Sequence, residues 1–271
     1  MIKGLCNMDN GYIPISNLQL IFSVSLVMIT GVISALFQLG LLKSLVWGTV
    51  RAFVQLSLIG YVLTYVFDWN SIWVIVPLIL LMCWIASREA TRRIKNAPEN
   101  PMPATFLSLT ASTFIVGLIV VAVIIGPEPW YSARVMIPIF GMLLGNSMNA
   151  IGLSLDRMYS DVLAHSEEVE QMLCFGATPW EAVVTHIKTA VTAGMTPTIN
   201  SLMVVGLVSL PGMMTGQILA GMDPQSAVRY QFVVMIMIAA SVAIGCLMMA
   251  GLSYKKMFTQ DLALVESMRK N

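Results

Sequence analysis

Seven apolar stretches, each close to the length of a helix that crosses a membrane, run through this chain of 271 residues. A helix needs about 20 mainly apolar residues to cross the hydrocarbon layer of a bilayer. Only 11% of the residues are charged and 57% are hydrophobic, whereas about 25% are charged in soluble domains. We therefore predict an all-α polytopic membrane protein. The predicted transmembrane helices cover residues 18–39, 51–67, 72–87, 105–125, 134–155, 196–219 and 230–254.

Between these stretches no polar segment is long enough to form a core of its own. We therefore expect residues 1–271 to form a single transmembrane domain with one polar insert at about residues 156–195. The net charge of +1 offers no basic field for nucleic acid, so we expect none as a partner and the lipid bilayer as the surroundings.

Lysine and arginine are distributed unevenly between the two sides of the predicted spans. One side holds Lys43, Arg51, Arg88, Arg92, Arg93, Lys95, Arg157, Lys188, Lys255, Lys256, Arg269 and Lys270. The other side holds Lys3, Arg134 and Arg229. Because positive residues favour cytoplasmic loops, this bias predicts an outside N-terminus, a cytoplasmic C-terminus and a cytoplasmic insert.

The chemistry missing from the spans narrows the function. No Asp, Glu, Lys or His lies deep in a predicted span, which argues against a carrier driven by protons. The chain lacks the GxxxxGK[ST] phosphate-binding loop, so ATP hydrolysis would need another polypeptide. The four cysteines show no paired spacing. We therefore expect no catalytic residue and no cofactor held by this chain, and we assign no metal ligands. A channel or a carrier powered by another protein remains.

The polar insert reads as a helix, a break and a second, short helix. Gly176 is predicted to follow the end of the first helix, because glycine is common just past a helix C-terminus. Thr178 is the expected N-cap of the second helix, with Pro179 at its first position and Glu181 at the capping-box spacing. Trp180 is large and apolar in a charged stretch, so a partner protein or the bilayer interface is expected to cover it.

The same insert resembles the coupling loop of ABC-transporter permeases, where a short helix after a glycine docks on the ATPase subunit. The residues that carry this likeness are Glu170, Gly176, Ala177, Thr178, Pro179 and Trp180. Gln171 and Met172 stand where that loop has paired alanines, and its usual Leu-Pro ending is missing. Residues 137–158 and 206–231 are closely similar to the Fet-type iron-export permeases of bacteria and to plant aluminium-tolerance ABC permease-like halves.

This resemblance implies the permease subunit of an ABC transporter in the bacterial inner membrane, exporting iron or another metal ion. It implies a homodimer that works with a separate ATPase, on which ATP and Mg²⁺ would bind. Two alternatives stay open, an ABC permease for a substrate other than a metal and a channel-like membrane protein without an ATPase.

Four amides are candidates for lining the transport pathway. Asn146 and Asn149 lie one turn apart in the fifth predicted span, and Gln55 and Asn200 lie in the second and sixth. Polar side chains in a membrane need a partner or water, so hydrogen bonding between helices is the alternative interpretation.

Pro211 and Gly212 interrupt the apolar run of the sixth predicted span. Proline removes a backbone donor and breaks a helix, so these residues mark either a simple kink or an outer gate.

Overall fold

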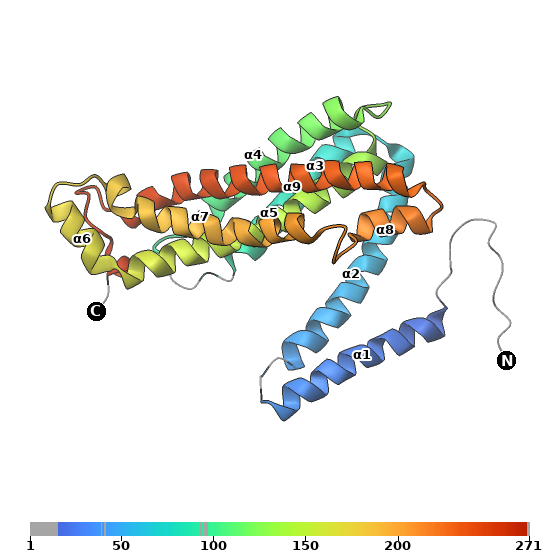
Figure 1. The fold of residues 1–271 in the computed structure, drawn as a ribbon, viewed down its shortest axis with the longest axis horizontal. Helices are drawn as coiled ribbons and strands as arrows, with labels where there is room; N and C mark the ends of the chain where they lie inside the picture. Colours follow the sequence, from blue (N-terminus) through green and yellow to red (C-terminus); the bar gives the residue numbers. More distant parts are fainter. Residues whose placement is uncertain (1–15, 39, 41, 93, 95–96, 270–271) are drawn as a thin grey trace. The chain divides into compact units, whose positions relative to one another are not determined.

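The computed structural model describes residues 16–38, 40, 42–92, 94 and 97–269. The predicted end of the first span, residue 39, lies outside the described residues. So do residues 1–15, for which the sequence predicted an outside location. Four cations of the charge count, Lys3, Arg93, Lys95 and Lys270, also lie outside them. The described residues form α-helices joined by short links and contain no β-strand, which confirms the all-α prediction (Figure 1).

The nine α-helices of the described chain are α1 (Asn17–Leu36), α2 (Leu42–Trp69), α3 (Ile72–Thr91), α4 (Met102–Ile119), α5 (Ala133–Ala164), α6 (Ser166–Cys174), α7 (Pro179–Val204), α8 (Gly212–Leu219) and α9 (Pro224–Ser253). A π-helical segment, η1 (Val120–Ile125), continues α4, and the 3₁₀ segments η2 (Tyr254–Met257) and η3 (Glu266–Met268) follow α9. Five helices of the described part are long and apolar enough to cross a membrane, namely α2, α3, α4 with η1, α5, and α9 with η2. The chain is thus a polytopic membrane protein, and the number of seven spans stays a prediction.

The described residues divide into two compact units. The smaller unit holds α1 and α2 together with residues 216–223. Within it, Gly31 of α1 meets the side chain of Leu42 at the start of α2. The larger unit holds residues 70–215 and 224–271, and α5 is its central helix, in contact with α3, α4, α7 and α9.

Small residues let the helices of the larger unit approach closely. A Cβ on Gly117 of α4 would lie 2.8 Å from the Phe140 ring of α5, and a Cβ on Gly194 of α7 would lie 2.6 Å from the Ala150 carbonyl oxygen of α5. Ser147 of α5 and Ser241 of α9 share a hydrogen bond of 3.0 Å between their hydroxyls. Close backbone contact and interhelical hydrogen bonds are how helices associate in lipid, where apolar surfaces gain little from meeting each other.

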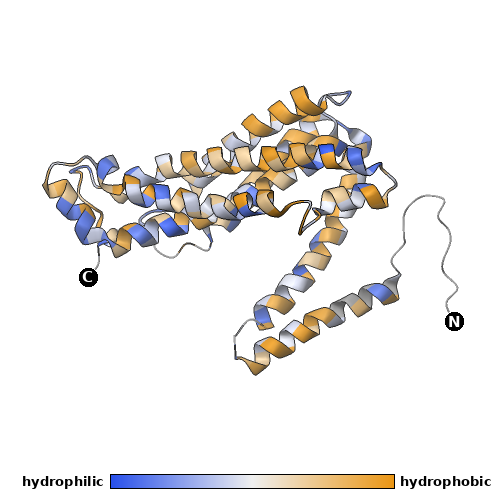
Figure 2. Ribbon diagram, in the orientation of Figure 1, coloured by the Kyte–Doolittle hydropathy of each residue, from blue (hydrophilic) through white to orange (hydrophobic). Residues whose placement is uncertain are grey.

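The expected short helix after Gly176 is instead the start of α7, which runs without a break for 26 residues. Gly194 and Pro197, which could have ended this helix, both lie inside it. Gly194 allows the close approach to α5, and the helix continues past Pro197 to Val204. The polar insert is therefore continuous with the helices of the bundle, because α5 extends into it from one side and α7 from the other. Hydrophilic residues gather at this end of the larger unit, around α6 and the first turns of α7 (Figure 2).

The predicted sixth span, residues 196–219, is not one helix. α7 ends at Val204, residues 205–211 form an irregular link, and α8 starts at Gly212. Val205 is extended and Gly206 has a φ of +84°, a left-handed conformation that glycine adopts without a steric penalty. The break thus begins several residues before Pro211.

Candidate functional site

The link between α6 and α7 is a tightly hydrogen-bonded corner, here called the coupling corner and comprising residues 170–181. Gly176 has a φ of +90°, and its N–H donates to the carbonyl of Leu173 at 3.0 Å. The N–H of Ala177 donates to the carbonyl of Met172, also at 3.0 Å. These two bonds form a Schellman motif, which satisfies the last carbonyls of a helix and needs a left-handed residue at this position. The sequence prediction for Gly176 as the end of a helix is confirmed.

The start of α7 completes the corner from the other side. The Thr178 N–H and hydroxyl donate to the Glu181 carboxylate at 2.8 and 2.7 Å, and the Glu181 N–H donates to the Thr178 hydroxyl oxygen at 3.3 Å. Pro179 occupies the first helical position, so the predicted capping box is confirmed. The hydroxyl of Thr178, followed by its backbone N–H, lowers the pKa of Glu181 below its ordinary value because both stabilise the carboxylate.

Two predicted coupling residues have partners within the chain. The Glu170 carboxylate forms an ion pair of 2.7 Å with Arg269 near the C-terminus. The Trp180 ring meets the Tyr254 ring edge to face, with centroids 5.1 Å apart, and stays 44% exposed. Phe175, which sequence reasoning did not select, is 91% exposed. The sequence feature that could have pointed to Phe175 is its position directly before Gly176, where a bulky aromatic residue follows the end of a polar helix.

A cavity of about 720 Å³ extends along α5 in the larger unit. It is walled by α5, α7 and α9, by the C-terminal end of α3, by the irregular link before α8 and by the start of α8. Its lining from α5 reaches from Met142 to Asp156, which at 1.5 Å per residue is about 21 Å. A hollow of this length, within a bundle of apolar helices, can hold a substrate on its way across the membrane.

Polar and charged groups line this cavity. Asn146 and Asn149 are both in the lining, and the Asn146 amide donates to the carbonyl of Met142 at 2.8 Å. Glu89 of α3 and Asp156 of α5 are in the lining too. Sequence reasoning missed both carboxylates because they lie one or two residues beyond the predicted span ends at Leu155 and Ser87. Their closeness to those ends was the signal that could have found them.

The structure brings together some of the predicted pathway residues. Asn146 and Asn149 line the cavity, and so do Pro211 and Gly212, which were predicted as a kink or gate. Asn200 lies on α7 with its side chain exposed and is not among the lining residues. Gln55 lies on α2, in the smaller unit, so its place on the pathway stays a prediction.

One helix joins the coupling corner to the cavity. α7 begins at Pro179 in the corner and contributes Gly194, Pro197, Thr198 and Ser201 to the cavity wall. From Pro179 to Gly194 the helix rises about 22 Å. Because a continuous helix moves as a stiff rod, a shift at the corner would reach the wall of the cavity directly.

Comparison with known proteins gives consistent matches over most of the chain. Residues 17–258 match a family described as "Uncharacterised protein family (UPF0014)". The UPF0014 membrane protein slr1647 of Synechocystis is 38% identical over 84% of this chain and 88% of its own length. The probable iron export permease protein FetB of Escherichia coli is 32% identical over 94% and 97%. Protein ALUMINUM SENSITIVE 3 of Arabidopsis thaliana is 34% identical over 88% and 86%. No solved structure matches this chain.

Proposed function

The chain belongs to the UPF0014 family of membrane proteins, and on that premise we propose that it is the permease subunit of an ABC transporter. In this proposal it exports iron or another metal ion, and a separate ATPase chain supplies the energy. The N-terminus lies outside and the coupling corner in the cytoplasm, in the inner membrane of a bacterium.

The observation that carries the proposal is the unbroken course of α7 from the coupling corner to the cavity. A transporter that draws energy from another chain needs a docking element and a rigid connection from it to the substrate path. The capping box and the Schellman motif fix the angle between α6 and α7, so force on the corner is not lost in a flexible joint. The exposed aromatic ring of Phe175 offers the apolar contact that dominates many protein interfaces.

The cavity lining supports a metal ion as the substrate. Glu89 and Asp156 supply carboxylates, and Asn146 and Asn149 supply amide oxygens. Oxygen ligands suit hard and borderline cations, and the thioethers of Met142, Met148, Met213 and Met235 in the same lining add softer donors. One of the relatives is named a probable iron export permease. A mixed set of weak ligands fits a site that must release its ion.

A second copy of the chain would complete the path. Gly145, Asn146 and Asn149 of α5 are exposed although they lie in an apolar helix, and the two asparagines face a cavity that is open to the surface. Polar groups at membrane depth need a partner or water. A homodimer that joins two such cavities would supply both, with two ATPase subunits holding ATP and Mg²⁺.

The proposal is tested by reconstituting the chain with its candidate ATPase in lipid vesicles. We expect Fe²⁺ to stimulate ATP hydrolysis and to be moved across the membrane. Replacing Asn146 and Asn149 by leucine should abolish the stimulation while the complex still assembles. Asn200→Leu is the matched control, because Asn200 is an exposed amide outside the cavity lining. Equal loss in the control, or failure of the double variant to assemble, would make these amides packing contacts. ATP hydrolysis indifferent to every metal ion would argue for another substrate.

A further inference from the structure

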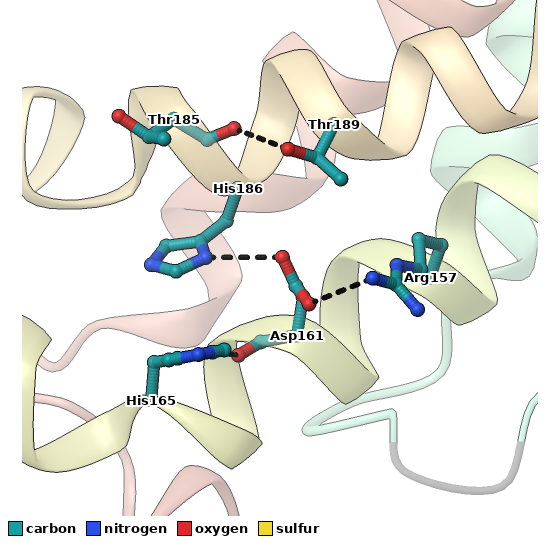
Figure 3. Close-up of polar contacts among 6 residues, drawn as sticks. All are labelled: Arg157, Asp161, His165, Thr185, His186 and Thr189. Carbon is teal, nitrogen blue, oxygen red and sulfur yellow. Dashed lines mark hydrogen bonds and ion pairs between the residues drawn. The ribbon is translucent and has the colours of Figure 1, made fainter.

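Both histidines of this chain lie in one cluster at the polar end of the larger unit. Asp161 is in the last turn of α5, His165 follows as the residue between α5 and α6, and His186 faces them from α7 (Figure 3). One ligand atom from each of the three side chains lies within 4.8 Å of the others. The two imidazole rings are stacked, with centroids 5.2 Å apart.

Hydrogen bonds fix which ring nitrogens are available. The Nδ1 of His165 lies 2.9 Å from the backbone carbonyl oxygen of Asp161, and the Nδ1 of His186 lies 3.1 Å from Asp161 Oδ2. The carbonyl oxygen can only accept, so the Nδ1 of His165 donates to it and the Nε2 of this ring faces away with its lone pair. A backbone carbonyl on one ring nitrogen is the usual support of a histidine that ligates a metal through the other. The Nδ1 of His186 faces a carboxylate oxygen directly, and an ion bound between these two atoms would replace the proton that they share.

The carboxylate is held in place as well. Arg157, one turn earlier on α5, forms an ion pair of 3.3 Å with Asp161 Oδ1. His186 is only 9% exposed, so its ring is confined between the helices, whereas His165 is exposed and open to an arriving ion. His186 and Asp161 are therefore already held in place, and an arriving ion would have to move only the exposed His165 side chain.

The distances are close to those of a bound ion. Ligand atoms bonded to one metal at about 2.1 Å lie about 3 to 4 Å from each other. The observed spread of up to 4.8 Å closes to that range with modest rotation of exposed His165. Two histidines and one carboxylate leave coordination positions open, and this ligand set suits Fe²⁺ and other borderline divalent transition metals.

We infer that Asp161, His165 and His186 form a binding site for a divalent transition-metal ion that joins the end of α5 to α7. None of the three residues lines the cavity, so the site is distinct from the proposed transport path. His186 lies seven residues after Pro179 on α7, about 10 Å along the helix from the coupling corner. An ion there would tie the helix that joins corner and cavity to the central helix α5.

The test measures binding to the purified full-length chain alone, so it does not depend on the transport proposal. The chain must carry no polyhistidine tag. Titration with Fe²⁺ under anaerobic conditions should show one ion per chain at this site, and Co²⁺ should give a visible ligand-field band. His165→Ala and His186→Ala should each lower the affinity at least about tenfold and remove the band. His165 is exposed, so its variant should fold normally and carries the test even where His186→Ala fails to fold.

Glu168→Gln is the matched control, because Glu168 is an exposed carboxylate on α6 that belongs neither to the cluster nor to the cavity lining. We expect the band and the affinity of the histidine site to survive this change. Loss of binding in the cavity variant Asp156→Asn, with unchanged binding in both histidine variants, would place the ion in the cavity and overturn the inference. Absence of saturable binding to the unaltered chain would also overturn it, and the cluster would then only hold α5 against α7.

Discussion

The two ends of α7 are built in opposite ways. At its first turn the coupling corner satisfies its backbone groups through a Schellman motif and a capping box. At its last turn the chain unwinds over residues 205–211, where Leu207 is 90% exposed and Val208 and Leu210 are exposed as well. One end is polar and locally rigid, and the other is apolar and irregular.

This difference shows what each end must contact. Apolar side chains on an irregular link are favourable only against lipid or another protein surface, because the exposed apolar area would be costly in water. A capped polar corner is stable in water and needs a partner only for its aromatic side chains. We therefore expect α7 to connect a docking surface in the aqueous phase with an irregular link that lies in the membrane.

The largest effect should come from labelling the two sides with a reagent that does not cross the membrane. In a background without Cys6 and Cys174, a cysteine at Asp223 should react in intact cells, because the link before α9 is predicted to lie outside. A cysteine at Glu168 in α6 should react only after the membrane is opened, since the corner is predicted to be cytoplasmic. Both positions are exposed, whereas neighbouring Ser166 is buried and unsuitable. Reaction of both positions in intact cells would break the comparison.

Proline at the left-handed glycine beside each end of α7 should separate the roles of the two ends. Gly176→Pro cannot adopt the φ of +90° and loses the N–H bond to Leu173, at a cost of about 3 kcal/mol or more. We expect it to abolish ATPase-coupled transport. Gly206→Pro loses the matching bond to Ser209, of 2.9 Å, and should impair transport while ATPase recovery stays normal. Co-purification from detergent measures that recovery, and equal loss in both variants would contradict the separate roles.

The sequence predicted the polar end of α7 well because its signals are local. Thr178, Pro179 and Glu181 lie within four residues, and each hydrogen bond of the capping box joins neighbours in the chain. At the other end the sequence predicted a kink or gate at Pro211 and Gly212 within the span of residues 196–219, whereas the helix already ends at Val204. Pro197 lies inside α7 without ending it, and the break falls before Pro211. Packing against the neighbouring helices decides where the helix ends, and the sequence alone does not specify this packing.

The cavity and the histidine cluster also differ in how far the sequence could predict them. Asn146 and Asn149 are three residues apart on one helix, so their shared face followed from helical spacing. Asp161 and His186 are 25 residues apart and meet only because α5 and α7 pack closely. Contacts of this second kind depend on the angle and depth at which two helices meet, which hydrophobic patterns do not specify.

Phe175 should contribute more to ATPase docking than Trp180, because part of the Trp180 ring is already covered by Tyr254. Phe175→Ala removes an exposed ring that makes no ring contact in the described chain, so we expect weaker ATPase binding by about 2 kcal/mol with unchanged thermal stability. Trp180→Ala should weaken binding too, but it also removes the contact with Tyr254 and should lower stability. Binding by the purified ATPase and a thermal-melt curve measure the two effects. Normal ATPase binding by both variants would rule out the corner as the docking surface.

A smaller effect is expected from the capping box itself. Thr178→Ala removes the hydroxyl that accepts from the Glu181 N–H, which commonly costs a helix about 1 kcal/mol. Hydrogen exchange at the first turn of α7 should accelerate roughly fivefold, while the corner keeps its Schellman bonds. Thr189→Ala is the control, because the Thr189 hydroxyl only bonds back to the Thr185 carbonyl of its own helix. Similar acceleration in both variants would assign the effect to α7 as a whole.

The smallest effect should appear in the pH dependence of that same turn. The pKa of Glu181 is lowered in the folded chain, so its contribution is complete above the ordinary carboxyl pKa of about 4.3 and fades as the pH falls through the lower folded value. After correction for intrinsic exchange rates, protection of the Thr178 amide should therefore decline in acid. Glu181→Gln keeps an oxygen that can accept this hydrogen bond but does not titrate. Its protection should start lower and stay level over the same range. A parallel decline in the variant would mean that acid loosens the corner through other groups, and the polar end of α7 would then be less self-contained than its hydrogen bonds imply.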